Sequence, residues 1–450
     1  MGRVYDAIVV GARCAGASTA MLLARKGHKV LLVDKSIFPS EIAHGHFIHR
    51  HGPRRLQTWG LLERIVATGC PPTTSFTLDT GEVRLTGRDL VLDGVAFGYG
   101  PRRGALDQVL VEAAMEAGVE FRAGCAVQDY LIESDRVVGI RAVDRTQGAS
   151  FEERAAIVVG ADGRGSRLAR VVGAAEYEVV PTLTCYFFSY WSEVPAAGLE
   201  MYVRRSRAIW AFPTNDGLFA VFVAWPIGEQ SAVQSDVERH FFAALDLAPE
   251  LAARVRAGRR AERFLGAANL PNFLRRPYGQ GWALVGDAGC HKDPFMALGI
   301  CDALRDAELL VAAIDEGLSG DASLQSALAQ YERRRNEATM PDYRRNLDRA
   351  QFKPPAQEEL RLQRALVDDQ ETTNRYFMAY EEMIPPESFF NPENLRVIME
   401  RGDKGGEGRL SRRTHDSASG RGSSANADPM PYADRASRST STAEKSATRR

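Results

Sequence analysis

The sequence lacks any hydrophobic run close to the roughly 20 residues that a membrane-spanning helix needs. It also lacks an excess of charge of either sign, because the formal net charge at pH 7 is −1, so nothing points to a nucleic-acid partner. Its six cysteines show neither metal-site nor disulfide spacing, which suits a reducing compartment. An apolar run begins at Tyr5 and leaves no room for a signal peptide. We therefore expect a cytoplasmic protein with no membrane span.

What the chain does have is enough length for two or three domains, at 450 residues of which 44% are hydrophobic. The residues from 403 onward differ from the rest, since they are rich in Ser, Arg, Ala and Gly and almost devoid of apolar side chains. Such a segment cannot bury enough surface to offset the entropy of ordering. We predict a disordered tail over 403–450.

The strongest local pattern lies in residues 5–34. An apolar β run ends at Gly11, an apolar helical run follows, and a second β run ends in the acid Asp34. Gly11 permits a sharp turn, and Gly16 permits close packing of helix on strand. The helix N-terminus then offers free N–H groups to a pyrophosphate, and Asp34 can bind ribose hydroxyls. Arg13 replaces the middle glycine of the usual fingerprint, and its guanidinium can reach a phosphate.

Two further strand-to-turn patterns occur later in the chain. Residues 157–170 run from an apolar strand into a turn containing Asp162 and Gly163, followed by a basic helix start. Residues 282–310 run from a strand to Gly286 and Asp287, then through a loop with Pro294 to Gly299 and a helix. The N-terminus of that helix could hold the polar edge of a ring.

These motifs, in this order and at these separations, resemble the flavoprotein aromatic hydroxylases, the FAD monooxygenases of the para-hydroxybenzoate hydroxylase type. They also resemble the related geranylgeranyl reductases and flavin halogenases. The resemblance covers about residues 5–345. It implies FAD as cofactor and NADPH or NADH as a transient electron donor. No second glycine-rich fingerprint is present, so the donor is expected to dock on the FAD domain itself.

The resemblance also implies roles for individual residues. The first glycine-rich loop would bind the FAD pyrophosphate, Asp34 the adenosine ribose, Asp287 the ribityl chain and residues 294–299 the isoalloxazine. The full set of expected cofactor-binding residues is Gly11, Arg13, Gly16, Asp34, Lys35, Arg103, Val127, Asp162, Gly163, Gly286, Asp287, Pro294, Leu298, Gly299 and Ile300.

The implied architecture is an α/β fold, with a Rossmann-like FAD-binding domain of the glutathione reductase type and an inserted antiparallel β-sheet substrate domain. Strand-like alternation over 180–225, with a turn at 214–217, supports a separate sheet. The expected FAD-binding segments are 1–75, 98–178 and 266–345. The expected substrate-domain segments are 76–97 and 179–265, and a C-terminal helical region covers 346–402.

Histidine is concentrated in one segment, because four of the eight copies lie at positions 44, 46, 49 and 51. No carboxylate or cysteine completes a ligand set there, so we predict no metal site. The corresponding family segment lies along the flavin, which makes His46 and His49 candidate catalytic residues through hydrogen bonding or proton relay. Histidines satisfied within a structural loop are the alternative.

Aromatic side chains alternate along the expected sheet, and one face of it should line a substrate chamber suited to a flat apolar molecule. Ordinary sheet packing is the alternative for any one of them. The candidate substrate-binding residues are Tyr186, Phe188, Tyr190, Trp210 and Phe212, with Phe222 and Trp225 further along the same pattern.

By resemblance, the expected reaction is NAD(P)H-dependent hydroxylation of a small aromatic or polyketide-like substrate, with dioxygen, through a flavin C4a-hydroperoxide. The alternative is reduction of an isoprenoid-like double bond, because residues 210–213 are similar to the Trp-x-Phe-Pro element of geranylgeranyl reductases. The Trp-x-Trp-x-Ile-Pro element of halogenases is absent. A non-catalytic FAD-bound regulator is a further alternative. The expected assembly is a monomer or a homodimer.

Overall fold

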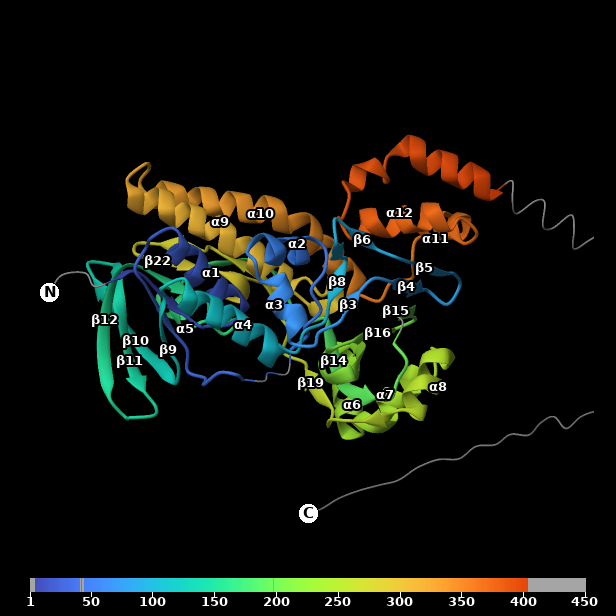
Figure 1. Ribbon diagram of the computed structural model, residues 1–450, viewed down its shortest axis with the longest axis horizontal. Helices are drawn as coiled ribbons and strands as arrows, with labels where there is room; N and C mark the ends of the chain where they lie inside the picture. The colour runs from blue at the N-terminus through green and yellow to red at the C-terminus, as the bar shows by residue number, and fades with distance from the viewer. Residues whose placement is uncertain (1–4, 41, 43, 197, 404–450) are drawn as a thin grey trace, which may run out of the picture. The chain divides into compact units, whose positions relative to one another are not determined.

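The computed structural model describes residues 5–40, 42, 44–196 and 198–403 (Figure 1). Apart from Asp403, the predicted disordered tail lies outside these residues. Two sheets of eight strands each, together with helices, make up the described chain. The expected α/β fold, with a second sheet and a C-terminal helical region, is confirmed.

The first sheet forms around the first apolar run of the chain. β1 (Tyr5–Val10) pairs in parallel with β2 (Val30–Val33) and β12 (Ser150–Gly160). Both faces of these strands are buried, one against helices and the other mainly against residues of further strands, which explains why β1 and β2 are apolar almost throughout. The remaining strands of this sheet are β9 (Glu120–Arg122), β10 (Cys125–Glu133), β11 (Arg136–Asp144), β21 (Tyr278–Gly279) and β22 (Trp282–Leu284).

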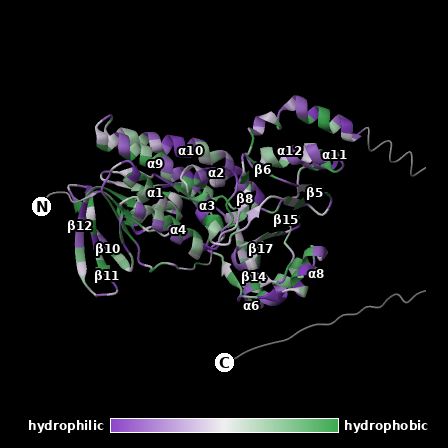
Figure 2. Ribbon diagram, viewed as in Figure 1, coloured by the Kyte–Doolittle hydropathy of each residue, from purple (hydrophilic) through white to green (hydrophobic). Residues whose placement is uncertain are grey.

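Helices cover this sheet and share one apolar core with it. In α10, the buried positions recur about every four residues, which is the spacing of one helix face, and the rest of the helix is hydrophilic (Figure 2). The longer helices of this part are α1 (Cys14–Arg25), α4 (Arg103–Glu116), α9 (Gly299–Ser319) and α10 (Leu324–Arg349). The shorter ones are α2 (His51–Thr58), α3 (Leu62–Ala67) and α5 (Arg167–Val171).

The second sheet combines strands from two distant parts of the chain. Its order is β18-β14-β17-β16-β15-β4-β5, with β19 on β14, and all pairs are antiparallel except β15 with β4. The strands are β4 (Phe76–Asp79), β5 (Arg84–Gly87), β14 (Thr184–Ser192), β15 (Leu199–Arg204), β16 (Arg207–Pro213), β17 (Phe219–Pro226), β18 (Arg259–Arg260) and β19 (Leu265–Ala267).

The two faces of this second sheet have different coverings. One face packs on α6 (Gln230–Ser235), α7 (Val237–Leu245) and α8 (Pro249–Ala257), and holds Trp225 in a buried core. The other face meets α11 (Gln357–Leu366) and α12 (Gln370–Tyr380) of the C-terminal region. Residues 392–403 are also helical. Small sheets complete the described chain: β13 (Glu176–Val180) with β20 (Asn272–Arg275) and β23 (Cys290–His291), β3 (Pro72–Thr73) with β8 (Gly98–Tyr99), and β6 (Val91–Leu92) with β7 (Val95–Ala96).

Candidate active site

The turn between β1 and α1 forms the first part of the site. Gly11 has a φ of +105°, a conformation that favours glycine, and its N–H donates to the Val33 carbonyl at 2.8 Å. A side chain at Gly16 would collide with the carbonyl oxygen of Gly11. Ala12 N–H donates to the Asp34 carboxylate at 2.7 Å, so the expected ribose-binding acid also closes this turn. The N-cap side chain of α1 makes no capping bond, which leaves the helix N-terminus open.

Two arginines converge on Asp107, to which the sequence motifs assigned no role. Arg13 Nη1 donates to its carboxylate at 2.8 Å, and Arg103 Nη2 donates to both of its oxygens at 3.0 Å. Asp107 is fully buried and Arg103 is nearly so. Among the described residues, the Arg103 Nε has no hydrogen-bond partner. Asp107 therefore fixes both guanidinium groups while leaving a buried donor beside the site.

The second motif follows β12. Ala161 N–H donates to the Val10 carbonyl at 2.8 Å, which brings this turn against the first one. Asp162 Oδ2 accepts from the Arg167 N–H at 2.7 Å, whereas its Oδ1 has no partner in the described part of the chain. Gly163 has a φ of +79°. The turn thus presents one free carboxylate oxygen.

The third motif follows β22 and leads into α9. Gly286 has a φ of +62°, and a side chain there would press on Ala15 of α1. Beyond Asp287, the loop before α9 is held by Asn346 of α10. Asn346 Oδ1 accepts from the Met296 N–H at 3.0 Å, and its Nδ2 donates to the Asp293 carbonyl at 2.8 Å. The sequence motifs did not single out Asn346.

A cavity of about 740 Å³ joins these three turns to the second sheet. Gly16, Gly286, Leu298 and Tyr190 are the expected site residues that do not line it. The expected cofactor-binding residues that do line it are Gly11, Arg13, Asp34, Lys35, Arg103, Val127, Asp162, Gly163, Asp287, Pro294, Gly299 and Ile300.

The chemistry of this cavity fits FAD. The open N-terminus of α1 and the free Arg103 Nε would hold the pyrophosphate, and Asp34 the adenosine ribose. Asp287 would bind the ribityl chain, and the N-terminus of α9 at Gly299 would face the polar edge of the isoalloxazine.

Comparison with known families matches residues 4–342 to a family described as FAD binding domain. The chain belongs to this FAD-binding family. The expected resemblance to the flavoprotein hydroxylase superfamily is therefore confirmed, and the protein is an FAD-dependent oxidoreductase. The family match ends inside α10, so the C-terminal helical region lies outside it.

Relatives of this chain within the superfamily carry different activities. Digeranylgeranylglycerophospholipid reductase of Methanosarcina acetivorans is 26% identical over 364 residues, which cover 76% of this chain and 83% of the reductase. The myxobacterial chondrochloren halogenase CndH superposes with a TM-score of 0.71 at 21% identity, covering 89% of this chain and 97% of CndH. PqsL of Pseudomonas aeruginosa, a probable FAD-dependent monooxygenase, superposes with a TM-score of 0.64 at 21% identity. The superposition covers 83% of this chain and 99% of PqsL.

His46 lies in the wall of the FAD cavity with both ring nitrogens bonded. Because the Gly100 carbonyl oxygen only accepts, His46 Nδ1 carries the hydrogen of that 3.1 Å bond. Tyr190 donates its O–H to His46 Nε2 at 2.9 Å. Burial, together with the Arg102 guanidinium, lowers the pKa of His46 to about 3. The imidazole is therefore neutral, with a fixed tautomer.

His49 connects the loop before α9 to the C-terminal region. Its Nε2 donates to the Met296 carbonyl at 3.1 Å, and its Nδ1 lies 2.7 Å from the Glu381 carboxylate. Both His49 and Glu381 are buried and line the cavity. The pair holds one proton between nitrogen and oxygen at the cavity wall.

The aromatic side chains of the second sheet divide between its two faces. Tyr190 bonds His46 from behind the cavity wall, while Trp225 lies on the opposite face against the helices. Those that line the cavity are Tyr186, Phe188, Trp210, Phe212 and Phe222. The C-terminal region, which the sequence did not assign to the site, also lines the cavity, with Arg349, Phe352, Lys353, Pro355, Glu359, Tyr380 and Glu381.

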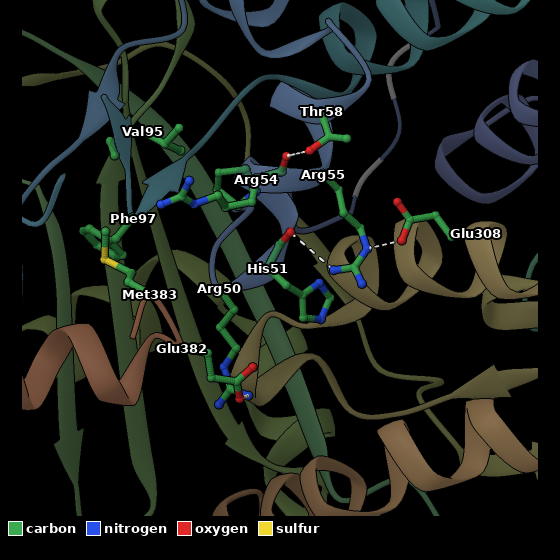
Figure 3. Close-up of a pocket in the computed structure, with 12 residues that line it drawn as sticks. Arg50, His51, Arg54, Arg55, Thr58, Val95, Phe97, Glu308, Glu382 and Met383 are labelled. Carbon is green, nitrogen blue, oxygen red and sulfur yellow. Dashed lines mark hydrogen bonds and ion pairs between the residues drawn. The ribbon is translucent and has the colours of Figure 1, made fainter. Parts of the chain in front are cut away.

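A smaller cavity of about 250 Å³ lies beside α2 (Figure 3). Its cations are paired with acids of other elements: Arg50 with Glu382 at 2.7 Å, and Arg55 with Glu308 at 2.7 Å. These ion pairs tie α2 to α9 and to the C-terminal region. The residues around this cavity therefore connect α2, α9 and the C-terminal region.

Within the described residues, every helix is too short or too polar to span a lipid bilayer. No group of three or more His, Cys, Asp or Glu side chains in this part of the chain is placed to hold a metal ion.

Proposed function

We propose that the protein is an NAD(P)H-dependent FAD monooxygenase that hydroxylates an aromatic or polyketide-like substrate. The observation that carries this proposal is the single cavity that runs from the FAD-binding turns to the aromatic face of the second sheet. A flat apolar substrate on that face would lie next to the isoalloxazine, in a chamber whose walls are mostly buried.

The chain's own residues would orient the substrate and exclude water. Reduced FAD supplies the electrons for oxygen activation. The neutral His46 keeps the charge of the chamber low, and its partner Tyr190 fixes the ring plane. The His49–Glu381 pair can hold or release a proton at the wall, next to the loop that ends at Gly299. The N-terminus of α9 favours negative charge on the nearby ring edge.

A basic rim supports a phosphate-bearing nicotinamide dinucleotide as electron donor. The cavity is lined on its FAD-domain side by the side chains of Lys35, Arg145, Arg164, Arg167 and Arg170. Cations in this number favour the approach of a polyphosphate. They support transient docking of NADPH or NADH on the FAD domain.

The second candidate is reduction of an isoprenoid-like double bond. Two observations favour it: the similarity to the digeranylgeranylglycerophospholipid reductase, and the position of Trp210 and Phe212 of the Trp-x-Phe-Pro element on the cavity. In that reaction, the double bond of a substrate held on this face, rather than dioxygen, would accept the electrons that FAD supplies.

The reaction with dioxygen tests the proposal. The holoenzyme is reduced anaerobically with NADPH or NADH and mixed with air-saturated buffer, and flavin absorbance and oxygen consumption are followed. A monooxygenase re-oxidises within seconds and, with a bound aromatic substrate, transfers labelled oxygen from dioxygen to the product. A reduced flavin that persists in air for minutes would overturn the proposal in favour of the reductase.

A further inference from the structure

One row of side chains crosses the cavity face of the second sheet from strand to strand. Phe188 of β14 lies opposite Phe222 of β17, and Phe222 lies opposite Trp210 of β16. Trp210 in turn faces Met201 of β15, and Met201 faces Leu78 of β4. All five side chains line the cavity. The row is therefore a continuous apolar track beneath the site.

The length of this track follows from sheet geometry. Neighbouring strands lie about 4.8 Å apart, so the four steps from β14 to β4 span about 19 Å. The ring stack of Phe188 and Phe222, with centroids 4.4 Å apart, marks one end. A single aromatic ring covers only a small part of such a track.

The cavity that holds this track also has polar lining residues and reaches the surface. These residues include Thr80, two positions after Leu78, and Lys353 and Glu359 of the C-terminal region. The Lys353 side chain is 56% exposed and pairs with Asp348 at 2.7 Å. A molecule on the track would thus keep its apolar length on the sheet and leave a polar end beside solvent.

We infer that the substrate is an elongated, mainly apolar molecule with a polar end group, which lies across β14 to β4 and enters beside Lys353. This inference rests on the proposed function for the identity of the site and deepens it by excluding a single-ring substrate. The C-terminal segment around Lys353 also lines this chamber, so that segment and the row together would set the accepted length.

The test measures binding without turnover. The oxidised holoenzyme is titrated with sodium benzoate, a single ring, and with sodium dodecanoate, an extended chain with a polar end, following the visible flavin spectrum. Dodecanoate should bind about tenfold or more tightly than benzoate, because each additional buried methylene adds to the apolar contact.

A bulky side chain placed halfway along the track tests whether the length of the ligand, and not its general affinity for the cavity, determines binding. Met201→Trp should weaken dodecanoate binding by about tenfold or more and benzoate binding by less than about threefold. Met201→Leu, which conserves the volume, should leave both affinities unchanged. Leu78→Trp, one strand further out, provides a second block if Met201→Trp does not retain FAD.

Equal wild-type affinities for the two probes, or equal losses of both in the blocked variants, would overturn the inference. Neither measurement uses dioxygen or NAD(P)H. If the protein proves to be a reductase, the proposed function is contradicted but the inferred length of the substrate is not. If the binding measurements fail, the inferred length is contradicted but the proposed function is not.

Discussion

The His49 imidazole lies 2.7 Å from the Glu381 carboxylate, although the two residues are 332 positions apart in the chain. The contact joins the histidine-rich segment, which faces the expected flavin position, to the end of α12. The next residues repeat the connection, since Arg50 bonds Glu382 at 2.7 Å and Asp342 at 2.8 Å. The C-terminal region is thus fastened to the wall of the cavity by a hydrogen bond and an adjacent ion pair.

Replacing Glu381 by Ala leaves a buried imidazole nitrogen without its partner. We expect this to lower the free energy of unfolding of the holoenzyme by about 1–3 kcal/mol, measured by urea denaturation. Glu382→Ala is the matched control, because Arg50 retains Asp342, and its loss should be smaller. Equal losses in the two variants would show that the His49 contact has no special weight.

Removing the Asp287 carboxylate should release the flavin. Asp287 lines the cavity just before the loop that faces the expected ring position. We expect Asp287→Ala to be purified as a largely colourless apoprotein, with FAD content read from the ratio of visible to ultraviolet absorbance. Asp315→Ala, which removes a surface acid paired with Lys26 and His28, should keep its colour. Full flavin content in Asp287→Ala would show that the third motif does not bind FAD through the Asp287 carboxylate.

Burial of neutral His46 should make the fold sensitive to acid. Its pKa is about 3 in the folded protein, against about 6.5 in an unfolded chain. Below about pH 6.5 the unfolded state therefore binds a proton that the folded state does not, and stability falls as the pH falls toward 3. The contribution is about 1.4 kcal/mol per pH unit. His46→Gln should flatten the pH dependence of the unfolding free energy by this amount.

Deletion of residues 403–450 should leave FAD content and turnover intact, because the composition of this tail predicts disorder. A deletion beginning at residue 346 should abolish both, since it removes Asn346 and the C-terminal wall of the cavity. If the protein lacking only residues 403–450 were insoluble or inactive, the tail would contribute to the fold.

The sequence predicted those features that depend on neighbouring residues. The turns at Gly11, Asp162 and Asp287 each combine the end of a strand with a glycine in a short segment. Their patterns can therefore be recognised from the local sequence alone. The alternation of aromatic residues likewise anticipated a sheet with two distinct faces.

The contacts that the sequence did not predict join residues that are far apart in the chain. Asp107 lies 94 positions from Arg13, and no local pattern marks it as the anion that fixes that guanidinium. Asn346 lies in α10 and Glu381 directly follows α12, and the roles of both residues follow only from how these two helices pack. The pairing of β4 with β15 in parallel is similarly invisible in either strand alone.

The residues that line the cavity run from Val10 to Glu381 in the chain. During synthesis, the nascent polypeptide therefore cannot complete the cofactor cradle until Ile300 has emerged from the ribosome, and it cannot close the chamber until Glu381 has followed. FAD binding is therefore expected only after most of the chain has been synthesised. Chains that end before residue 346 are expected to carry no flavin colour, because they lack Asn346 and the C-terminal residues that line the cavity.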